Sequence, residues 1–182
     1  MQFIITTITK VNTDLIYQAQ ALAQKLNKKF VTRNNLSLER LKQDNNVDNI
    51  LIFTKDGLKA HTSQGDLFFH LNMAQLRILN LNRNQKDHMV EAMDLKPKMS
   101  VLDCTLGLGT DATVASYIVG ENGKVVGLES ATLIYLITKY GLANFNHDNI
   151  AINHSLRRIE SFNLHYLDYL KAQGDNSFDI VY

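Results

Sequence analysis

One stretch of the sequence, residues 96–129, constrains the fold more than any other. It reads KPKMSVLDCTLGLGTDATVASYIVGENGKVVGLE. An apolar run at 101–102 leads into a glycine-spaced turn, and a helix is predicted over 110–119. A second glycine turn then precedes another apolar strand over 124–128, which ends on an acid. Strand, glycine turn, helix, strand and acid in this order predict half of a mononucleotide-binding α/β fold.

The spacing of polar residues and glycines inside this stretch predicts a ligand site. Asp103 ends the first strand, and Gly107 and Gly109 follow it at plus four and plus six. Glycine permits positive φ and lets the backbone approach a ligand closely. The helix start beyond it offers unpaired N–H groups. Glu129, at the tip of the next strand, is placed to accept hydrogen bonds from both hydroxyls of a ribose.

Two cofactors fit this half-fold. Gly107-x-Gly109-x-x-Ala112, with an acid about 20 residues further on, satisfies a dinucleotide fingerprint. Counted from Asp103, the same residues give the S-adenosylmethionine pattern, an acid followed by small residues or glycine at plus two, four and six. A carboxylate at Asp103 suits the cofactor's amino group but repels a pyrophosphate. S-adenosylmethionine is therefore predicted, with an NAD-dependent Rossmann oxidoreductase or a non-catalytic nucleotide-binding or scaffold protein as alternatives.

Composition narrows the class of protein. The chain has 182 residues, 45% of them hydrophobic and 20% charged, which suits one domain or one and a half. A net charge of +1 gives no bulk attraction to nucleic acid, and a single cysteine excludes an internal disulfide. No apolar run approaches the roughly 20 residues of a membrane span, and the start lacks a signal-peptide pattern. The six histidines show no metal-ligand spacing. A cytoplasmic protein without a metal or membrane partner is expected.

The chain is predicted to divide into a small α/β N-terminal unit (1–70), a helical bridge (71–95) and a Rossmann-like domain (96–182). Within the first unit a short strand is predicted at 29–32. The bridge helix carries Met73, Leu76 and Leu79 on one side, and its methionine is interpreted as core filler. Charged side chains at Arg77, Arg157 and Arg158 are interpreted chiefly as solvated surface.

The end of the sequence adds one expectation. The last predicted strand reads FDIVY and closes the chain at Tyr182, so the predicted Rossmann-like sheet contains only its first four strands. Catalytic groups of such sheets lie just beyond the carboxyl ends of the strands. A C-terminally incomplete sheet, and thus a fragment, is the expectation.

The residues resemble a known family. VLDCTLGLGTDA, the strand end Glu129-Ser130, the run Tyr140-Gly141-Leu142 and the final FDIVY are similar to class I methyltransferases that form N2-methylguanine in small-subunit ribosomal RNA. The similarity to their uncharacterised Gram-positive relatives is greater and extends to the N-terminal unit. The resemblance implies S-adenosylmethionine as cofactor and ribosomal RNA as partner, and it leaves the oligomeric state open.

The resemblance also implies roles for individual residues. Its cofactor-binding positions are Asp103, Gly107 and Gly109 around the methionine end, Thr110 and Asp111 at the helix start, Glu129 and Ser130 at the ribose, and His165 and Tyr166 on the adenine side. The family continues after the FDIVY strand into an Asp-Pro-x-x segment that orients the guanine amine. Because the catalytic residues are expected just after Tyr182, this chain is expected to bind cofactor and to be inactive in methyl transfer.

Overall fold

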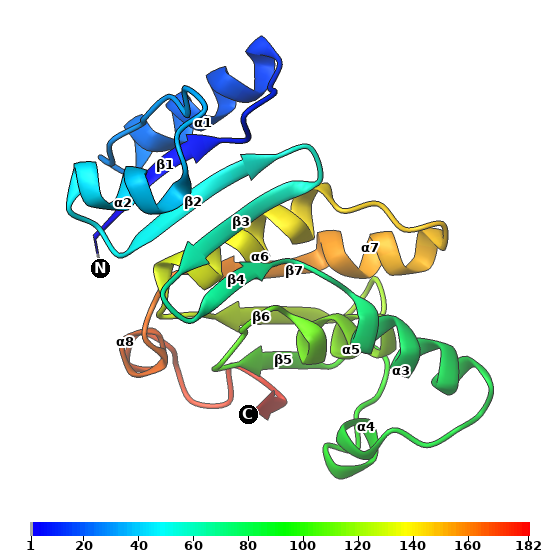
Figure 1. Cartoon of the computed structure of the whole chain (residues 1–182). Coiled ribbons are helices and arrows are strands. Elements are labelled where there is room, and N and C mark those ends of the chain that lie inside the picture. The colour runs from blue at the N-terminus through cyan, green and yellow to red at the C-terminus, as the bar shows by residue number, and fades with distance from the viewer. Residues whose placement is uncertain (1) are drawn as a thin grey trace. The chain divides into compact units, whose positions relative to one another are not determined.

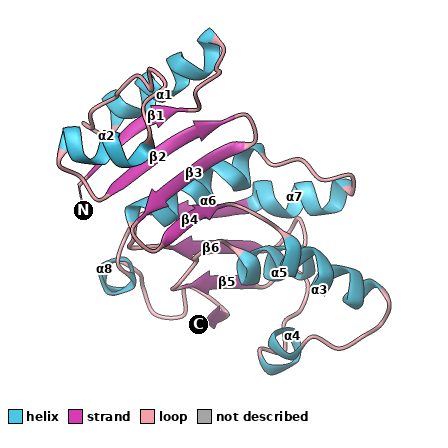
Figure 2. Cartoon of the chain, in the orientation of Figure 1, coloured by secondary structure: helices cyan, strands magenta, loops and turns pink. Residues whose placement is uncertain are grey.

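The structure, a computed structural model, describes residues 2–182 and falls into two compact units (Figure 1). The first ends at Phe69, and the second runs from His70 to Tyr182. Each unit has its own sheet, with helices packed against it (Figure 2). The predicted α/β class with a Rossmann-like parallel sheet is confirmed.

The first unit is a four-stranded sheet with two helices. In chain order its elements are β1 (Phe3–Thr7), α1 (Thr13–Lys25), α2 (Leu38–Asn45), β2 (Asn49–Thr54), β3 (Gly57–Thr62) and β4 (Gly65–Phe68). The strands lie in the order β1-β2-β3-β4, parallel between the first two and antiparallel thereafter. Asn12 and Ser37 cap the two helices by accepting backbone N–H bonds, as their residue types predict. The strand predicted at 29–32 is instead a single bridge between Phe30 and Ile5.

The second unit contains the remaining elements. They are α3 (Asn72–Asn82), α4 (His88–Ala92), β5 (Ser100–Asp103), α5 (Thr110–Val119), β6 (Lys124–Leu128), α6 (Thr132–Asn144), α7 (Ile150–Arg158), β7 (Ile159–Phe162), α8 (Tyr166–Lys171) and β8 (Ile180–Val181). All four strands are parallel, in the order β7-β6-β5-β8. The helices α3 and α4, predicted as a bridge, lie within this unit.

Strand order in the second unit indicates where a ligand is expected to bind. The chain places β6 and β7 successively on one side of β5 and then returns to place β8 on its other side. The reversal between β5 and β8 is a topological switch point. Ligands of open α/β sheets bind in the crevice at the carboxyl ends of the strands next to such a point. The predicted site residues at the ends of β5 and β6 lie at this edge.

Apolar packing fixes the sheet that carries this edge. The central strands bury Leu102, Val126 and Leu128, and Tyr169, Leu170 and Phe178 pack against them from α8 and the segment after it. The helix α5 is buried over most of its length and packs against α3 and α7. A helix that is apolar nearly all round is expected only when neighbours cover it on several sides.

One expectation for the second unit, the buried face of α3, is wrong. Met73 is 55% exposed, and Leu76 and Leu79 on the same helix are exposed too, whereas Ala74 and Ile78 form the buried face of α3. The buried face of α3 therefore consists of Ala74 and Ile78, and the helix packs against α5.

The adjacent arginines of α7 are structural and not simply solvated. Arg157 donates to the carbonyl oxygens of Leu142 and Phe145 at the end of α6, and Arg158 donates to the carbonyl of Ser116 in α5 at 2.9 Å. The last carbonyls of a helix lack intrahelical donors, so a guanidinium there satisfies them.

Within residues 2–182, no helix is long and apolar enough to cross a membrane.

Candidate functional site

The carboxyl ends of the parallel strands bring the predicted site residues to one edge of the sheet. Asp103 ends β5, Glu129 follows β6, His165 lies shortly after β7, and Tyr182 follows β8. The glycine loop joins β5 to α5 between them. These positions are fixed by the ladder that pairs Asp103 with Gly127 and Leu128 with Phe162.

The glycine loop owes its shape to glycines at two positions. Gly107 and Gly109 both have positive φ, 53° and 77° respectively. Residues other than glycine rarely adopt such φ values. A Cβ at Gly109 would also lie 3.3 Å from the Cγ2 of Thr138. Thr138, a buried polar residue of α6, donates from its hydroxyl to the Gly107 carbonyl at 2.6 Å. The loop is therefore tied to a helix that follows it in sequence.

Glu129 holds the loop from the other side. Its Oε2 accepts from the Gly107 N–H at 3.0 Å, and its Oε1 accepts from the Ala131 N–H at 2.7 Å. Ala131 caps α6 without a side-chain bond of its own, so the carboxylate satisfies the start of that helix and complements its dipole. Each carboxylate oxygen has two lone pairs. Both Glu129 oxygens therefore keep acceptor capacity for a ribose.

Asn163 locks the segment that carries Glu129. Its side-chain amide donates to the carbonyl oxygens of Glu129 at 2.7 Å and Ser130 at 3.2 Å, and its Oδ1 accepts from the hydroxyl of Thr132. The Asn163 side chain thus forms hydrogen bonds with three groups between Glu129 and Thr132. This arrangement is preorganised before any ligand binds.

A hollow of about 160 Å³ opens beside Glu129. Four of the predicted residues line it together, from two strand ends: Glu129 and Ser130 after β6, and His165 and Tyr166 after β7. The remaining lining residues are Cys104, Thr105, Leu128 and Leu164. The rings of His165 and Tyr166 stack with centroids 4.6 Å apart. A lining that combines apolar side chains, aromatic rings and a carboxylate suits a nucleoside.

Asp103 lies on the other side of the loop and is 1% exposed. Its Oδ1 accepts from the Thr105 N–H at 2.9 Å, and its Oδ2 accepts from the Tyr182 hydroxyl at 3.0 Å. Burial raises the pKa of Asp103 to about 6, and the carboxylates of Asp111 and Glu129 add to the rise, whereas the two hydrogen bonds oppose it. A buried carboxylate with two further carboxylates near it favours a cationic ligand group.

Asp111, in the first turn of α5, is bound by Arg77 of α3. The Arg77 guanidinium contacts the Asp111 carboxylate with one nitrogen and forms a two-point pair with Asp87 through the others, at 2.7 and 2.9 Å. Burial opposes the charge of Arg77, but its hydrogen bond to Asp87 raises its pKa. The Asp111 side chain is still 52% exposed. Thr110 begins α5, where the first backbone N–H groups face the loop.

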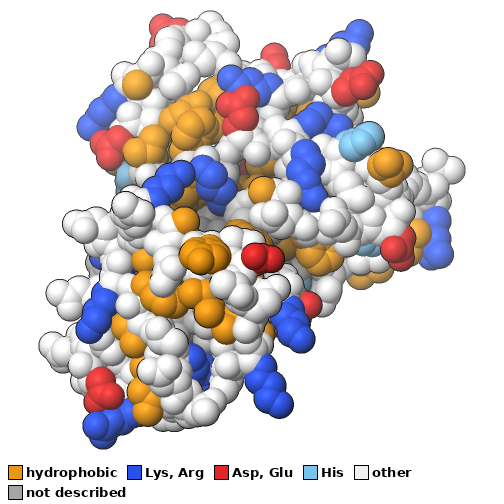
Figure 3. Space-filling view, turned by 90° about the horizontal axis from the view of Figure 1, so that it is seen from above, with side chains coloured by type: hydrophobic (Ala, Val, Ile, Leu, Met, Phe, Trp, Pro, Cys, Tyr) orange, Lys and Arg blue, Asp and Glu red, His pale blue; other side chains and the backbone are white. Residues whose placement is uncertain are grey.

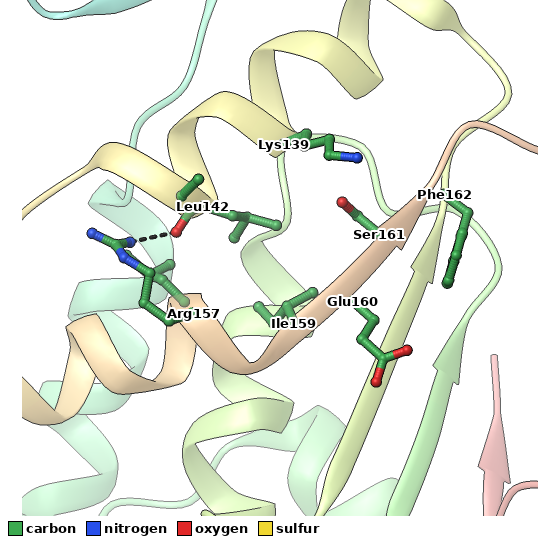
Figure 4. Close-up of a pocket in the computed structure, with 9 residues that line it drawn as sticks. Lys139, Leu142, Arg157, Ile159, Glu160, Ser161 and Phe162 are labelled. Atoms are coloured by element: carbon green, nitrogen blue, oxygen red, sulfur yellow. Dashed lines mark hydrogen bonds between the residues drawn. The ribbon is translucent and has the colours of Figure 1, made fainter.

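A larger hollow, of about 400 Å³, lies elsewhere in the second unit (Figure 4). Figure 4 shows Lys139 from α6, Arg157 from α7 and the side chains of β7 around it, with the Arg157 guanidinium bound to the Leu142 carbonyl. None of the nine residues that line it is among the predicted cofactor positions. This hollow is separate from the site at the carboxyl ends of the parallel strands.

Some of the site's residues escaped prediction from the sequence. Asn163 and Thr138 carried a weak signal, because each is a polar residue directly after or within an apolar segment. Arg77 and Tyr182 carried none, since their partners lie 34 and 79 residues away. Among the described residues, no group of three or more His, Cys, Asp or Glu side chains could hold a metal ion.

Comparisons with known proteins bear on the family and the fold of the chain. Residues 83–157 match the model of the family described as protein-L-isoaspartate(D-aspartate) O-methyltransferase. The chain is 35% identical over 179 residues to the uncharacterized protein YpiP of Bacillus subtilis, covering 98% of this chain and 69% of YpiP. It is 34% identical over 71 residues to the protein-L-isoaspartate O-methyltransferase of Methanothermobacter thermautotrophicus, covering 37% of this chain and 33% of that protein.

A solved structure shares the fold. The S-adenosylmethionine-dependent methyltransferase NGO1261 of Neisseria gonorrhoeae superposes with a TM-score of 0.63 at 16% identity, covering 98% of this chain and 67% of that one. At this identity the likeness concerns the fold. The chain therefore has the fold of an S-adenosylmethionine-dependent methyltransferase.

Proposed function

The chain belongs to the same protein family as YpiP of Bacillus subtilis, and from this premise we propose that it binds S-adenosylmethionine as the cofactor-binding part of an RNA methyltransferase. The homologues and the fold imply this cofactor. The single observation that carries the proposal is the pair of carboxylates, Asp103 and Glu129, on adjacent strand tips with the positive-φ glycine loop between them. None of the relatives named above supports an NAD-dependent oxidoreductase.

The residues of the site fit the two ends of the cofactor. Glu129 has lone pairs left for the ribose hydroxyls, and His165 and Tyr166 form a stacked wall for the adenine. Asp103 accepts from two neutral donors, the Thr105 N–H and the Tyr182 hydroxyl, so its charge is left for the cofactor's ammonium. When bound, S-adenosylmethionine supplies a sulfonium methyl group, which requires mainly an in-line nucleophile.

The proposed acceptor is the exocyclic amine of a guanine in small-subunit ribosomal RNA. The support is the resemblance of the loop DCTLGLG and of the strand ends to that family. A guanine amine is a poor nucleophile, because its lone pair is delocalised into the ring. It needs acceptors for its N–H groups and an aromatic side chain against the displaced base. In the family, the segment after the strand matching FDIVY supplies these groups.

Overall charge does not add to the RNA proposal. The net charge is +1, and on the face shown in Figure 3 the Lys and Arg side chains are scattered among acidic and apolar ones. The affinity of a protein for nucleic-acid phosphates rises when its Lys and Arg side chains are clustered. Any RNA contact therefore depends on local groups near the strand tips.

A carboxyl acceptor is the second candidate, favoured by the match to the isoaspartate methyltransferase family. That match covers residues 83–157, which hold the glycine loop, Glu129 and the helix α5 between them. It ends before β7 and β8. The matched part therefore bears on cofactor binding more than on the choice of acceptor, so we give RNA precedence.

We predict that a polypeptide of residues 1–182 binds S-adenosylmethionine. The residues proposed to hold the two ends of the cofactor lie together at the strand ends of this polypeptide. Isothermal titration measures the binding. Transfer is measured with tritiated cofactor on 30S subunits, on naked small-subunit RNA and on an isoaspartyl peptide.

YpiP, of which this chain spans 69%, is the matched comparison. Labelling of RNA, by residues 1–182 or by YpiP, agrees with the proposal. Labelling of the isoaspartyl peptide alone would replace RNA by a carboxyl acceptor. The absence of any response of residues 1–182 to the cofactor would contradict the proposed function itself.

A further inference from the structure

Tyr182 is a residue of the strand-tip edge for which neither the sequence pattern nor the comparisons give a role. Its backbone is fixed to β5 on both sides: its N–H donates to the Leu102 carbonyl at 3.1 Å, and its carbonyl accepts from the Cys104 N–H at 2.8 Å. This pairing turns the phenol toward Asp103, and the hydroxyl donates to Oδ2 at 3.0 Å. The contact joins residues 79 positions apart.

We propose that Tyr182 is a positioning residue for the cofactor, whose hydroxyl keeps the Asp103 carboxylate ionised and oriented for the cofactor's ammonium group. Tyr182 thereby sets the pH range over which S-adenosylmethionine binds. The inference rests on the proposed function, since it assumes that the ammonium is bound at Asp103.

The hydrogen bonds around Asp103 give the hydroxyl this influence. The carboxylate is 1% exposed, so solvent contributes little to its ionised form. Both of its donors are neutral, the Thr105 N–H at Oδ1 and the Tyr182 hydroxyl at Oδ2. A hydrogen bond to the ionised form favours that form. Removing one of two such donors therefore shifts the carboxyl group toward its protonated state.

Other charged groups near the pair shift the pKa of Asp103 or the pKa of the Tyr182 phenol. Asp111 of α5 and Glu129 after β6 both raise the pKa of Asp103. Burial raises the pKa of the Tyr182 phenol, the Asp103 charge adds to this, and Arg77 of α3 opposes it, so the phenol stays protonated and can donate. Asp103 in turn adds to the burial effect that raises the pKa of the Cys104 thiol.

Two ligands separate this role from simple packing. S-adenosylmethionine carries the ammonium, whereas 5′-methylthioadenosine keeps the adenine and ribose but lacks the amino-acid end. If Tyr182 acts through Asp103, its loss weakens only the first ligand and only where Asp103 titrates. If Tyr182 merely supports the edge of the sheet, both ligands weaken together at every pH.

The experiment measures dissociation constants for both ligands, by isothermal titration from about pH 5 to about pH 7.5, where an α-amino group stays largely protonated. In the unchanged chain, affinity for S-adenosylmethionine should rise with pH through a midpoint near 6, the pKa of Asp103. In Tyr182→Phe the midpoint should move up by about one pH unit. Binding should then be about fivefold weaker near pH 6 and within about twofold near pH 7.5.

The matched control is Tyr117→Phe. The Tyr117 hydroxyl also forms a hydrogen bond, 2.9 Å to Asn82, but on the C-terminal half of α5. It should leave both ligands and the midpoint unchanged. An unchanged midpoint in Tyr182→Phe, or an equal loss of both ligands, would overturn the inference while leaving the proposed function standing. Failure of the unchanged chain to bind S-adenosylmethionine at any pH would instead overturn the proposed function.

A second variant keeps the inference testable if Tyr182→Phe does not fold. Asp103→Asn removes the titrating group and keeps hydrogen-bonding atoms at the same place. Its affinity for S-adenosylmethionine should be weak and independent of pH over the same range, with 5′-methylthioadenosine bound as before. A midpoint near 6 that persists in this variant would contradict the inference, because another group would then carry the titration.

Discussion

Replacing Glu129 by alanine should lower the affinity for S-adenosylmethionine by at least about 100-fold. In the proposed binding mode this carboxylate accepts from both ribose hydroxyls, and hydrogen bonds to a charged group contribute about 1.5–3 kcal/mol each. The variant also frees the N–H groups of Gly107 and Ala131, so the glycine loop and the start of α6 lose their shared acceptor. Loss of preorganisation weakens binding further.

The measurement is isothermal titration with S-adenosylmethionine and with 5′-methylthioadenosine. Both ligands carry the ribose, so both should weaken, in contrast to the selective effect expected for Tyr182→Phe. Glu160→Ala is the matched control, because Glu160 is an exposed glutamate on the neighbouring strand β7 and lines the separate hollow of Figure 4. Affinity of Glu129→Ala within about threefold of the unchanged chain would contradict the ribose assignment.

Replacing Arg77 by leucine should lower the free energy of unfolding by about 3 kcal/mol at neutral pH. The Asp87 side chain is 9% exposed and is paired with Arg77 through two nitrogens. It also caps α4 by accepting from the N–H groups of Met89 and Val90. Removal of the guanidinium leaves this carboxylate buried without its partner, and α3, α4 and α5 lose their common ion pair.

The pH dependence of this effect has a definite sign. The hydrogen bond from Arg77 holds the pKa of Asp87 below its usual value. Such a group stabilises the folded state at pH above its unfolded pKa, about 3.9, and the stabilisation is lost as the pH falls through the lower folded pKa. The difference between Arg77→Leu and the unchanged chain should therefore be largest near neutral pH and shrink below about pH 4.

Urea unfolding followed by circular dichroism measures this difference. Arg40→Leu is the control, since the pair of Arg40 with Asp44 has side chains that are 63% and 40% exposed. An exposed pair contributes about 0–1 kcal/mol, so this variant should change little. Equal losses for the two variants would show that burial of the Asp87 pair does not matter.

The sequence alone predicted the helix and the strand that follow the glycine loop. The helix at Thr110–Val119 and the strand at Lys124–Leu128 have the predicted bounds. Their signals are local: an apolar run, glycines that permit positive φ, and turn residues at both ends. The parallel sheet also followed from the sequence, because strands joined by a helix pair in parallel. The positions of Asp103 and Glu129 at adjacent strand tips follow from that rule.

The sequence did not show which long-range partner each polar side chain has. Arg77 and Arg158 read as surface charges, yet one pairs with Asp87 and Asp111 and the other satisfies a carbonyl of α5. A periodic pattern identifies a helix and its apolar stripe, but not the neighbour that covers it. Met73 is exposed because Ala74 and Ile78 form the buried face of α3, a choice made by close packing against α5.

The same division runs through the candidate site. Residues in the loop motif and at the strand ends were recognisable, since glycine, acid and helix start follow one another within a short stretch. The contacts that make them a site were not, because Thr138, Asn163 and Tyr182 come from segments after the loop and meet it only when the sheet forms. Local backbone requirements in the sequence determined that a ligand site is expected at the ends of β5 and β6. The tertiary structure determined the environment of the Asp103 carboxyl group, because its burial and its hydrogen bond to Tyr182 exist only after distant strands pair.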